Sequence, residues 1–244
     1  MLIDKGYFTF TDGSLLSLAV DETTGDLYGT GQDGYVFVCN GTRTGVAPSC
    51  RIIVQEPPLS ALFFALALNT KDRLIYYTTS TYEGKGEVRQ VGMDGSDPKV
   101  LVSLNVFILT GIALDLEAST LYFTDYCPGS VYSYDLNGGK TTELFNPDSP
   151  YALAVFGDRF YWSEPRSGRL ASSAKDGSDY RVEYQNGYWI YQLTVGKRSA
   201  SKGAAWTEIG LKGVTLKGAT LKEADLISGA LSKMRGVVQT NLCV

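Results

Sequence analysis

A short apolar segment with alanine at its centre recurs along the chain, and this repeat constrains the fold more than any other feature. The four copies are Leu18-Ala19-Val20-Asp21, Leu66-Ala67-Leu68-Asn69, Ile112-Ala113-Leu114-Asp115 and Leu153-Ala154-Val155, and a weaker copy is Leu193-Thr194-Val195. The alanines are separated by 48, 46 and 41 residues. A period in this range is typical of propellers, solenoids and other repeat architectures.

An aromatic segment and a turn signal follow each of the four copies. The aromatic segments are Leu27-Tyr28-Gly29-Thr30, Tyr76-Tyr77-Thr78-Thr79, Tyr122-Phe123-Thr124-Asp125 and Tyr161-Trp162-Ser163-Glu164. The turn signals are Asn40-Gly41, Asp94-Gly95-Ser96, Asn137-Gly138-Gly139 and Asp176-Gly177-Ser178. Asx-Gly pairs supply the positive φ angles of a tight hairpin, so each pair predicts a reversal between two strands.

One repeat therefore comprises an inner strand, an aromatic strand, a third strand and an outer strand. Four antiparallel strands in roughly 40 to 45 residues form one blade of a β-propeller. A helical fold is excluded because the segments are short, rich in β-forming residues and interrupted by glycine. The sequence predicts an all-β propeller of four-stranded antiparallel blades, with either six blades, one of them incomplete, or five.

Two stretches of the chain resemble the YWTD repeat, also called the LDL-receptor class B repeat. They run from Gly111-Ile112-Ala113-Leu114-Asp115 through Leu121-Tyr122-Phe123-Thr124-Asp125 to Asp135-Leu136-Asn137-Gly138-Gly139, and from Tyr151-Ala152-Leu153-Ala154-Val155 through Tyr161-Trp162-Ser163-Glu164 to Lys175-Asp176-Gly177-Ser178. The resemblance covers roughly residues 15 to 195, with the second blade recognisable and the first degenerate. Propellers of this family usually have six blades, lie outside cells in receptors and matrix proteins, and bind proteins or organise neighbouring modules.

The resemblance also implies roles for individual residues. The residues of the motif itself are expected to pack and bond within and between blades, and they are Tyr122, Phe123, Thr124, Asp125, Tyr161 and Trp162. Ligands of YWTD propellers typically lie on the face formed by the loops just after the aromatic motif. Transferred by position, that face comprises Gln32, Asp33, Tyr82, Glu83, Tyr126, Pro165 and Arg166.

Residues 199–244 admit two interpretations, and residues 1–198 form YWTD-type blades in both. Ala205-Trp206-Thr207-Glu208 resembles a worn aromatic motif, which predicts a fifth blade followed by a closing strand. Leu211, Leu216, Leu221, Leu226 and Leu231 instead recur every five residues, as in the pentapeptide-repeat family, whose units wind a square β-helix. Five such units make barely more than one coil, and coils need stacked neighbours for stability. We therefore favour the fifth blade.

Composition excludes several classes of function. The chain has 22 Lys and Arg against 26 Asp and Glu, a net charge of −4 and no His, so it lacks the basic surface that binds nucleic acid and the commonest general base. The longest apolar run, Leu59 to Leu68, is too short to span a membrane. Met1 to Lys5 does not resemble a secretory signal, so an extracellular chain would be a mature form or an ectodomain fragment. We expect no cofactor and no metal site.

The cysteines indicate an oxidising compartment. Cys39 and Cys50 bracket a segment that contains Gly41, Gly45 and Pro48, which predicts a loop closed by one structural disulfide. Cys127 and Cys243 lie far apart in the sequence, and their pairing stays open.

A predicted turn carries a modification signal. Asn40-Gly41-Thr42 is an N-glycosylation sequon, and it lies in the context that glycosylation needs if the chain is secreted. Its neighbour Cys39 favours that extracellular location.

Three functions fit these observations. The leading hypothesis is a non-catalytic extracellular propeller that binds a protein partner or organises an extracellular assembly. The alternative is a lactonase-like or strictosidine-synthase-like hydrolase with a metal or carboxylate in the central channel, towards which Asp21, Asn69 and Asp115 could point. The third is self-assembly through the tail, with an unpaired Cys127 or Cys243 at the contact.

Overall fold

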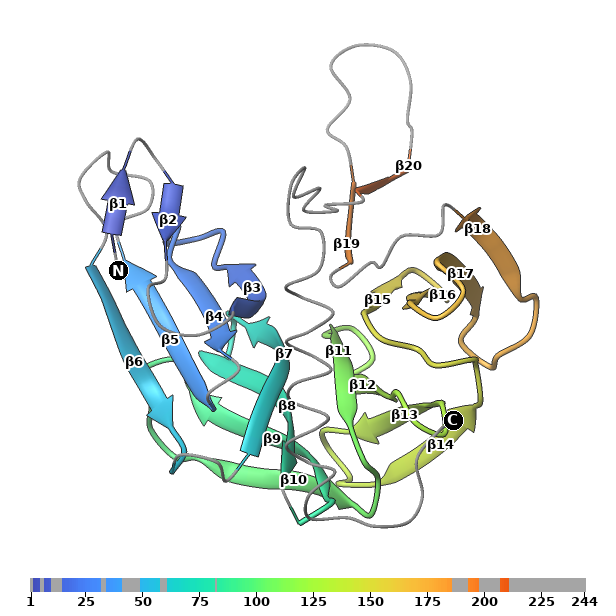
Figure 1. Cartoon of the computed structure of the whole chain (residues 1–244), viewed down its shortest axis with the longest axis horizontal. Helices are drawn as coiled ribbons and strands as arrows, with labels where there is room; N and C mark the ends of the chain where they lie inside the picture. Colours follow the sequence, from blue (N-terminus) through green and yellow to red (C-terminus); the bar gives the residue numbers. More distant parts are fainter. Residues whose placement is uncertain are drawn as a thin grey trace.

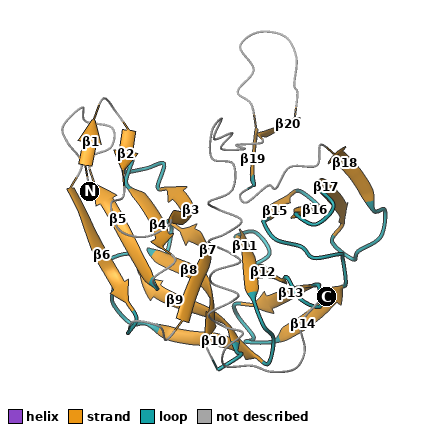
Figure 2. Cartoon of the chain, viewed as in Figure 1, coloured by secondary structure: helices purple, strands orange, loops and turns teal. Residues whose placement is uncertain are grey.

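The structure is a computed structural model, and its elements are strands throughout the described part of the chain (Figures 1 and 2). The described residues are 2–4, 7–9, 15–31, 34–40, 49–57, 61–81, 83–185, 193–197 and 207–210. The prediction of an all-β propeller is confirmed for this part of the chain.

Sixteen of the strands form four antiparallel sheets, and each sheet is one blade. Blade 1 contains β3 (Leu15–Val20), β4 (Leu27–Gly31), β5 (Tyr35–Asn40) and β6 (Ser49–Gln55). Blade 2 contains β7 (Ala61–Asn69), β8 (Leu74–Thr81), β9 (Gly86–Gly92) and β10 (Lys99–Leu104). Blade 3 contains β11 (Leu109–Asp115), β12 (Thr120–Asp125), β13 (Ser130–Asp135) and β14 (Thr141–Phe145). Blade 4 contains β15 (Leu153–Phe156), β16 (Arg159–Glu164), β17 (Arg169–Ala174) and β18 (Arg181–Gln185).

The first strand of every blade lies at the centre of the propeller. Strands β3, β7, β11 and β15 contact one another in that order, and β15 also contacts β19 (Thr194–Lys197). Within each sheet the strands follow the order of the sequence, so the fourth strand lies at the periphery (Figure 1). The alanine-centred segments are therefore the inner strands, as the repeat predicts.

Two further strand pairs lie outside these four blades. Strand β1 (Leu2–Asp4) pairs with β2 (Tyr7–Thr9), and β19 pairs with β20 (Thr207–Gly210). Thr194 of β19 stands opposite Gly210, whereas Ala154 of blade 4 stands opposite Tyr161. By this pairing, Gly210 occupies the position of the first motif residue. The sequence predicts Ala205 at that position instead.

The boundary at residues 198 and 199, the number of blades and the pentapeptide alternative stay predictions. Residues 211–244 lie outside the described part of the chain.

The aromatic motif packs each blade against both of its neighbours. The first motif residue faces the following blade and the second faces the preceding one, because successive side chains of a strand point to opposite faces. Tyr76 of blade 2 accordingly shares a buried cluster with Phe123 of blade 3, and Tyr122 of blade 3 shares the next cluster with Trp162 of blade 4. The contacts between blades are therefore continuous aromatic cores.

The alanines of the inner strands belong to the same clusters. Ala113 stands directly opposite Tyr122 across the sheet, and both side chains pack towards blade 4. A small residue leaves room beside the tyrosine ring at this narrow part of the propeller.

Blade 1 replaces two motif residues by glycine, and rings from the adjacent strand cover both positions. Gly29 stands opposite Phe37 and Gly31 opposite Tyr35. A Cβ atom added at either glycine would collide with the opposite ring. Aromatic side chains commonly compensate a glycine across a strand pair in this way.

Three of the four Asx-Gly signals lie where the sequence predicts reversals. Asp94-Gly95-Ser96 connects β9 to β10, and Asp176-Gly177-Ser178 connects β17 to β18. In both turns the Asp Oδ1 atom accepts a hydrogen bond at 2.9 Å from the backbone N–H two residues later. Asn137-Gly138-Gly139 connects β13 to β14. In the fourth signal Asn40 ends β5, and Gly41 lies outside the described residues.

The inner strands depart from regular pairing near their starts, and the third motif residue compensates for this. Register shifts interrupt the ladder between β7 and β8 and between β11 and β12. There the Thr78 hydroxyl accepts a hydrogen bond from Ala65 N at 3.1 Å, and the Thr124 hydroxyl accepts one from Gly111 N at 2.8 Å. Each hydroxyl thus replaces a lost ladder bond.

The same hydroxyl groups connect each blade to the next. Thr30 Oγ1 donates to the carbonyl oxygen of Phe64 at 3.2 Å, and Thr78 Oγ1 donates to that of Thr110 at 3.0 Å. Thr124 Oγ1 donates to the carbonyl oxygen of Tyr151 at 3.1 Å. In blades 2 and 3 one buried hydroxyl therefore satisfies backbone groups of its own blade and of the next one, and we refer to it as the hydroxyl latch.

Replacing Thr124 by valine tests the hydroxyl latch. The Thr124→Val variant keeps the shape of the side chain but leaves Gly111 N–H and Tyr151 C=O without this partner. A buried unpaired polar group costs about 1–3 kcal/mol, so the free energy of unfolding in a urea titration should fall by at least about 2 kcal/mol. Thr142→Val, at an exposed position of β14, is the control and should change it little. Equal losses in the two variants would contradict the latch.

Candidate functional site

The predicted ligand face lies at the edge of the propeller where the second strands end and the first strands begin. Four of its seven predicted residues are described: Glu83 and Arg166 are exposed, Tyr126 is half-buried and Pro165 is buried. The other three, Gln32, Asp33 and Tyr82, lie outside the described residues. The buried Pro165 directly follows the buried Glu164 and opens a tight turn closed by Gly168.

The structure brings two of the predicted residues together across the boundary between blades 3 and 4. The guanidinium carbon of Arg166 lies 5.5 Å from the centre of the Tyr126 ring. The Tyr126 ring in turn meets the edge of Tyr151 at 6.0 Å, with the ring planes at 84°. We call Tyr126, Tyr151 and Arg166 the Tyr–Arg platform.

Tyr151 was not among the predicted residues of this face. It directly precedes the inner strand of blade 4, and the start of an inner strand lies at the same edge as the end of an aromatic strand. Its place in Tyr151-Ala152-Leu153 is therefore the signal that could have identified it.

Asp125, the last residue of the motif in blade 3, supports the loop that carries Tyr126. Its side chain is fully buried, and its Oδ1 atom accepts a hydrogen bond from Cys127 N at 2.9 Å. Its Oδ2 atom has no hydrogen-bond partner. Burial raises the pKa of Asp125 to about 7, and the negative charge of Glu143 acts in the same direction, while the bond from Cys127 opposes both.

Glu164 occupies the corresponding position in blade 4 and supports the loop that carries Arg166. Its Oε1 atom accepts hydrogen bonds from Trp162 Nε1 at 3.1 Å and from the Tyr180 hydroxyl at 3.3 Å. Its Oε2 atom accepts one from the Ser167 hydroxyl at 3.1 Å. A motif-ending acid thus holds each of the two loops that form the Tyr–Arg platform.

Blades 1 and 2 lack an acid at the equivalent position. Gly31 and Thr79 stand there instead. Acidic support of this kind is therefore confined, within the four described blades, to the two that build the platform.

The polar residues that end the inner strands bond within turns and between blades at the opposite edge. Asp21 accepts a hydrogen bond from Thr23 N at 2.9 Å and pairs with Arg73 of blade 2 at 3.0 Å. Asp115 pairs with Lys175 of blade 4 at 2.6 Å, and the Lys175 ammonium also lies 5.9 Å from the centre of the Tyr122 ring.

Asn69 is engaged in a turn of its own. Its Oδ1 atom accepts a hydrogen bond from Asp72 N at 3.1 Å, and its Nδ2 atom donates to Asp72 Oδ2 at 2.9 Å. The three residues suggested for a hydrolytic centre therefore all have structural partners.

The central cavity gives these three residues no shared site. It measures about 50 Å³ and lies between the inner strands. Its walls include Ser17, Ala65, Leu66, Gly111, Ile112 and Leu153, and neither Asp21, Asn69 nor Asp115 lines it. Among the described residues, no group of three or more His, Cys, Asp or Glu side chains could hold a metal ion.

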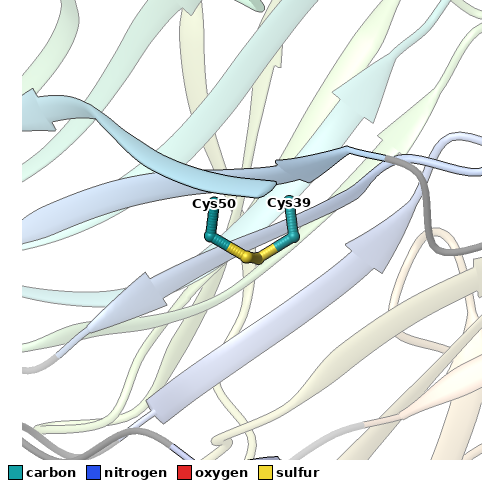
Figure 3. The surroundings of a disulfide bond; sticks show 2 residues. All are labelled: Cys39 and Cys50. Carbon is teal, nitrogen blue, oxygen red and sulfur yellow. A yellow bond between two sulfur atoms is a disulfide. The ribbon is translucent and has the colours of Figure 1, made fainter. Parts of the chain in front are cut away.

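The predicted disulfide between Cys39 and Cys50 is present (Figure 3). The two cysteines stand opposite each other on β5 and β6, with their Cα atoms 4.0 Å apart. The bond therefore fastens the outer strand of blade 1 to its neighbour.

Cys127 is disulfide-bonded as well, so the expectation of one structural disulfide is wrong, and so is a contact through an unpaired Cys127. The sequence left this open because its spacing does not indicate a partner. Cys243 lies outside the described residues.

No described segment forms a helix of the length and apolar character that a membrane span requires.

Replacing Asp125 by asparagine tests the cause of its raised pKa. The folded state holds the proton up to about pH 7, whereas the unfolded chain releases it near pH 4. The contribution of Asp125 to the free energy of unfolding is therefore greatest below about pH 4 and is lost as the pH rises from about 4 through 7. Asp125→Asn cannot ionise, so above pH 7 it should be more stable than the wild type by roughly 2–4 kcal/mol in urea titrations. Glu117→Gln, at an exposed position, serves as the control; an Asp125→Asn profile parallel to that of the wild type would contradict the assignment.

The comparisons with known sequences identify receptors as relatives. The chain is 30% identical over 169 residues to the vitellogenin receptor Yl of Drosophila melanogaster and 21% identical over 178 residues to the vitellogenin receptor of Solenopsis invicta. These matches cover 68% and 70% of this chain, but 8% and 9% of the two receptors. The chain thus spans less than a tenth of the length of the curated relatives it matches. No family model matches the chain.

Solved structures share the fold at low sequence identity. A luciferin-regenerating enzyme has a TM-score of 0.57, with 76% of this chain and 66% of that chain covered, and U3-55K has a TM-score of 0.55, with 72% and 53% covered. Both are 14% identical to the chain, so the likeness concerns the fold alone. The recurrent aromatic motif, the four-stranded blades built around it and the match to the vitellogenin receptors together show that the chain belongs to the YWTD β-propeller family.

Proposed function

We propose that the chain is a non-catalytic extracellular module that binds a protein partner through its predicted ligand face. The observation that carries this proposal is the Tyr–Arg platform, in which two adjacent blades present a half-buried tyrosine and an exposed arginine at that face. The relatives are named as receptors for vitellogenin, a protein ligand.

The platform has the chemistry of a binding hot spot. Tyrosine and arginine are enriched at such sites because they bury a large area and also donate hydrogen bonds. The contact of Tyr126 with Tyr151 restricts the ring, which lowers the entropy that binding would cost. A guanidinium group can also stack on an aromatic ring, as Arg166 does on Tyr126.

An extracellular location is supported by the disulfides and by the receptor relatives. Disulfides such as Cys39–Cys50 persist in oxidising compartments and are rare in the cytosol. A secreted protein is therefore the class of partner that we propose, and the names of the relatives make vitellogenin the first to be tried.

The hydrolase alternative gains no support from the described residues. Such an enzyme needs a metal or a carboxylate at the central channel, whereas Asp21 and Asp115 are occupied in ion pairs between blades. The likeness to the luciferin-regenerating enzyme concerns the fold alone. Self-assembly through the tail is tested separately, by sedimentation of the purified chain with and without residues 199–244.

Arginine and tyrosine variants test the proposed binding. The immobilised chain is exposed to purified vitellogenin, and the equilibrium dissociation constant is measured by surface plasmon resonance. Arg166→Ala and Tyr126→Ala should each weaken binding by at least about tenfold, which corresponds to about 1.4 kcal/mol and is typical of a hot spot. Lys140→Ala removes an exposed cation from the opposite edge of blade 3 and should bind as the wild type does.

Two results would count against this proposal. Unchanged binding by both platform variants would show that another surface binds the partner. Failure of the wild-type chain to bind vitellogenin or any protein from an extracellular fluid would remove the binding function itself.

A further inference from the structure

One motif of the sequence has no part in the proposed ligand face. Asn40-Gly41-Thr42 is the single Asn-x-Ser/Thr sequence in the chain. The asparagine belongs to blade 1, whereas the Tyr–Arg platform lies between blades 3 and 4.

The structure leaves the side chain of Asn40 accessible. Asn40 is the last residue of β5 and is exposed, whereas Cys39 before it is fully buried. Its side-chain amide makes no hydrogen bond to another described residue. In the β9–β10 turn of blade 2 and the β17–β18 turn of blade 4, the side chains of Asp94 and Asp176 instead each accept a hydrogen bond from a backbone N–H.

The end of strand β5 therefore differs from these two turns in how its polar side chain is held. A side chain that caps its own turn is fixed by that hydrogen bond. Asn40 stands opposite Ser49 at the end of the β5–β6 ladder, where its alternation with the disulfide-bonded Cys39 directs it away from the core. Asn40 is thus an exposed polar residue at the end of β5, and the Cys39–Cys50 disulfide fixes this end of the strand.

We propose that Asn40 carries an N-linked glycan. The reaction transfers an oligosaccharide from a lipid-linked pyrophosphate donor in the secretory pathway to Nδ2 of Asn40. A bond forms between Nδ2 and C1 of the first sugar, the bond between C1 and the pyrophosphate oxygen breaks, and the lipid pyrophosphate leaves with the proton lost by the amide. No electrons are gained or lost.

The topology also places this glycan relative to the ligand face. Strand β5 begins at the edge where β4 ends, which is the edge of the predicted ligand loops, and it runs to the opposite edge. Asn40 therefore lies at the far edge of blade 1. A bulky, hydrated glycan there excludes macromolecules from that edge and leaves the Tyr–Arg platform open.

The test uses the full chain, secreted from cultured animal cells behind a cleavable leader. Treatment with peptide-N-glycosidase should lower its mass by one glycan and convert Asn40 to Asp in the tryptic peptide. Asn40→Gln and Thr42→Ala should each abolish the mass shift. Thr42→Ser preserves the sequon and Thr44→Ala changes a threonine outside it, so both should keep the glycan.

Each outcome bears on the proposal. A secreted wild-type chain without a glycan, from cells that glycosylate a co-expressed control protein, would overturn it. A glycan that persists in Thr42→Ala would overturn the assignment to Asn40. Enzymatic removal of the glycan from the folded chain should leave its affinity for vitellogenin unchanged, and a gain of tenfold or more would contradict the placement at the far edge. Absence of vitellogenin binding in both forms would concern the proposed ligand face and not the glycan, because the mass shift is read independently.

Discussion

The propeller depends on one buried hydroxyl group per blade. The inner strands crowd around a centre that leaves only a small cavity, and their first residues depart from regular sheet pairing. Backbone groups buried in this way need partners, and in blades 2 and 3 the threonine at the third motif position supplies them for its own blade and for the next one. The same hydroxyl groups therefore join neighbouring blades and provide hydrogen-bond partners for the backbone of the inner strands. Aromatic rings pack against each other in the same contacts between blades.

The two edges of the propeller use charge differently. At the far edge, carboxylates at the ends of inner strands pair with cations of the following blade, as Asp21 does with Arg73 and Asp115 with Lys175. At the ligand edge, the motif-ending acids are turned inward to hold loops, and the cation of Arg166 stays exposed. The carboxylates that end inner strands thus join blades at the far edge, whereas the motif-ending acids hold loops at the ligand edge.

The sequence predicted the blades well because each blade repeats the same local requirements. Alternation, Asx-Gly turns and a small residue opposite a ring are visible along the chain, as Ala113 and Tyr122 illustrate. The site was predicted only in part. Tyr126 and Arg166 followed from position in the repeat, but their contact depends on how two blades meet, which no single repeat encodes. The contact of Tyr151 with Tyr126, the burial of Pro165 and the pairing of β19 with β20 arise from the same kind of long-range geometry.

Blade 1 shows that an aromatic ring can fill a motif position from the neighbouring strand. Gly29 removes an aromatic side chain from β4, and Phe37 on the adjacent strand places its ring over the same spot. The quantity that a blade needs is thus a ring within a cross-strand pair, and either strand of the pair can provide it. Degenerate blades in other chains should accordingly be sought by comparing paired strands. In such a blade, a glycine replaces an aromatic motif residue on one strand, and an aromatic residue stands opposite it on the neighbouring strand. A motif search along the sequence would miss such a blade, although aromatic rings still fill the same positions between its strands.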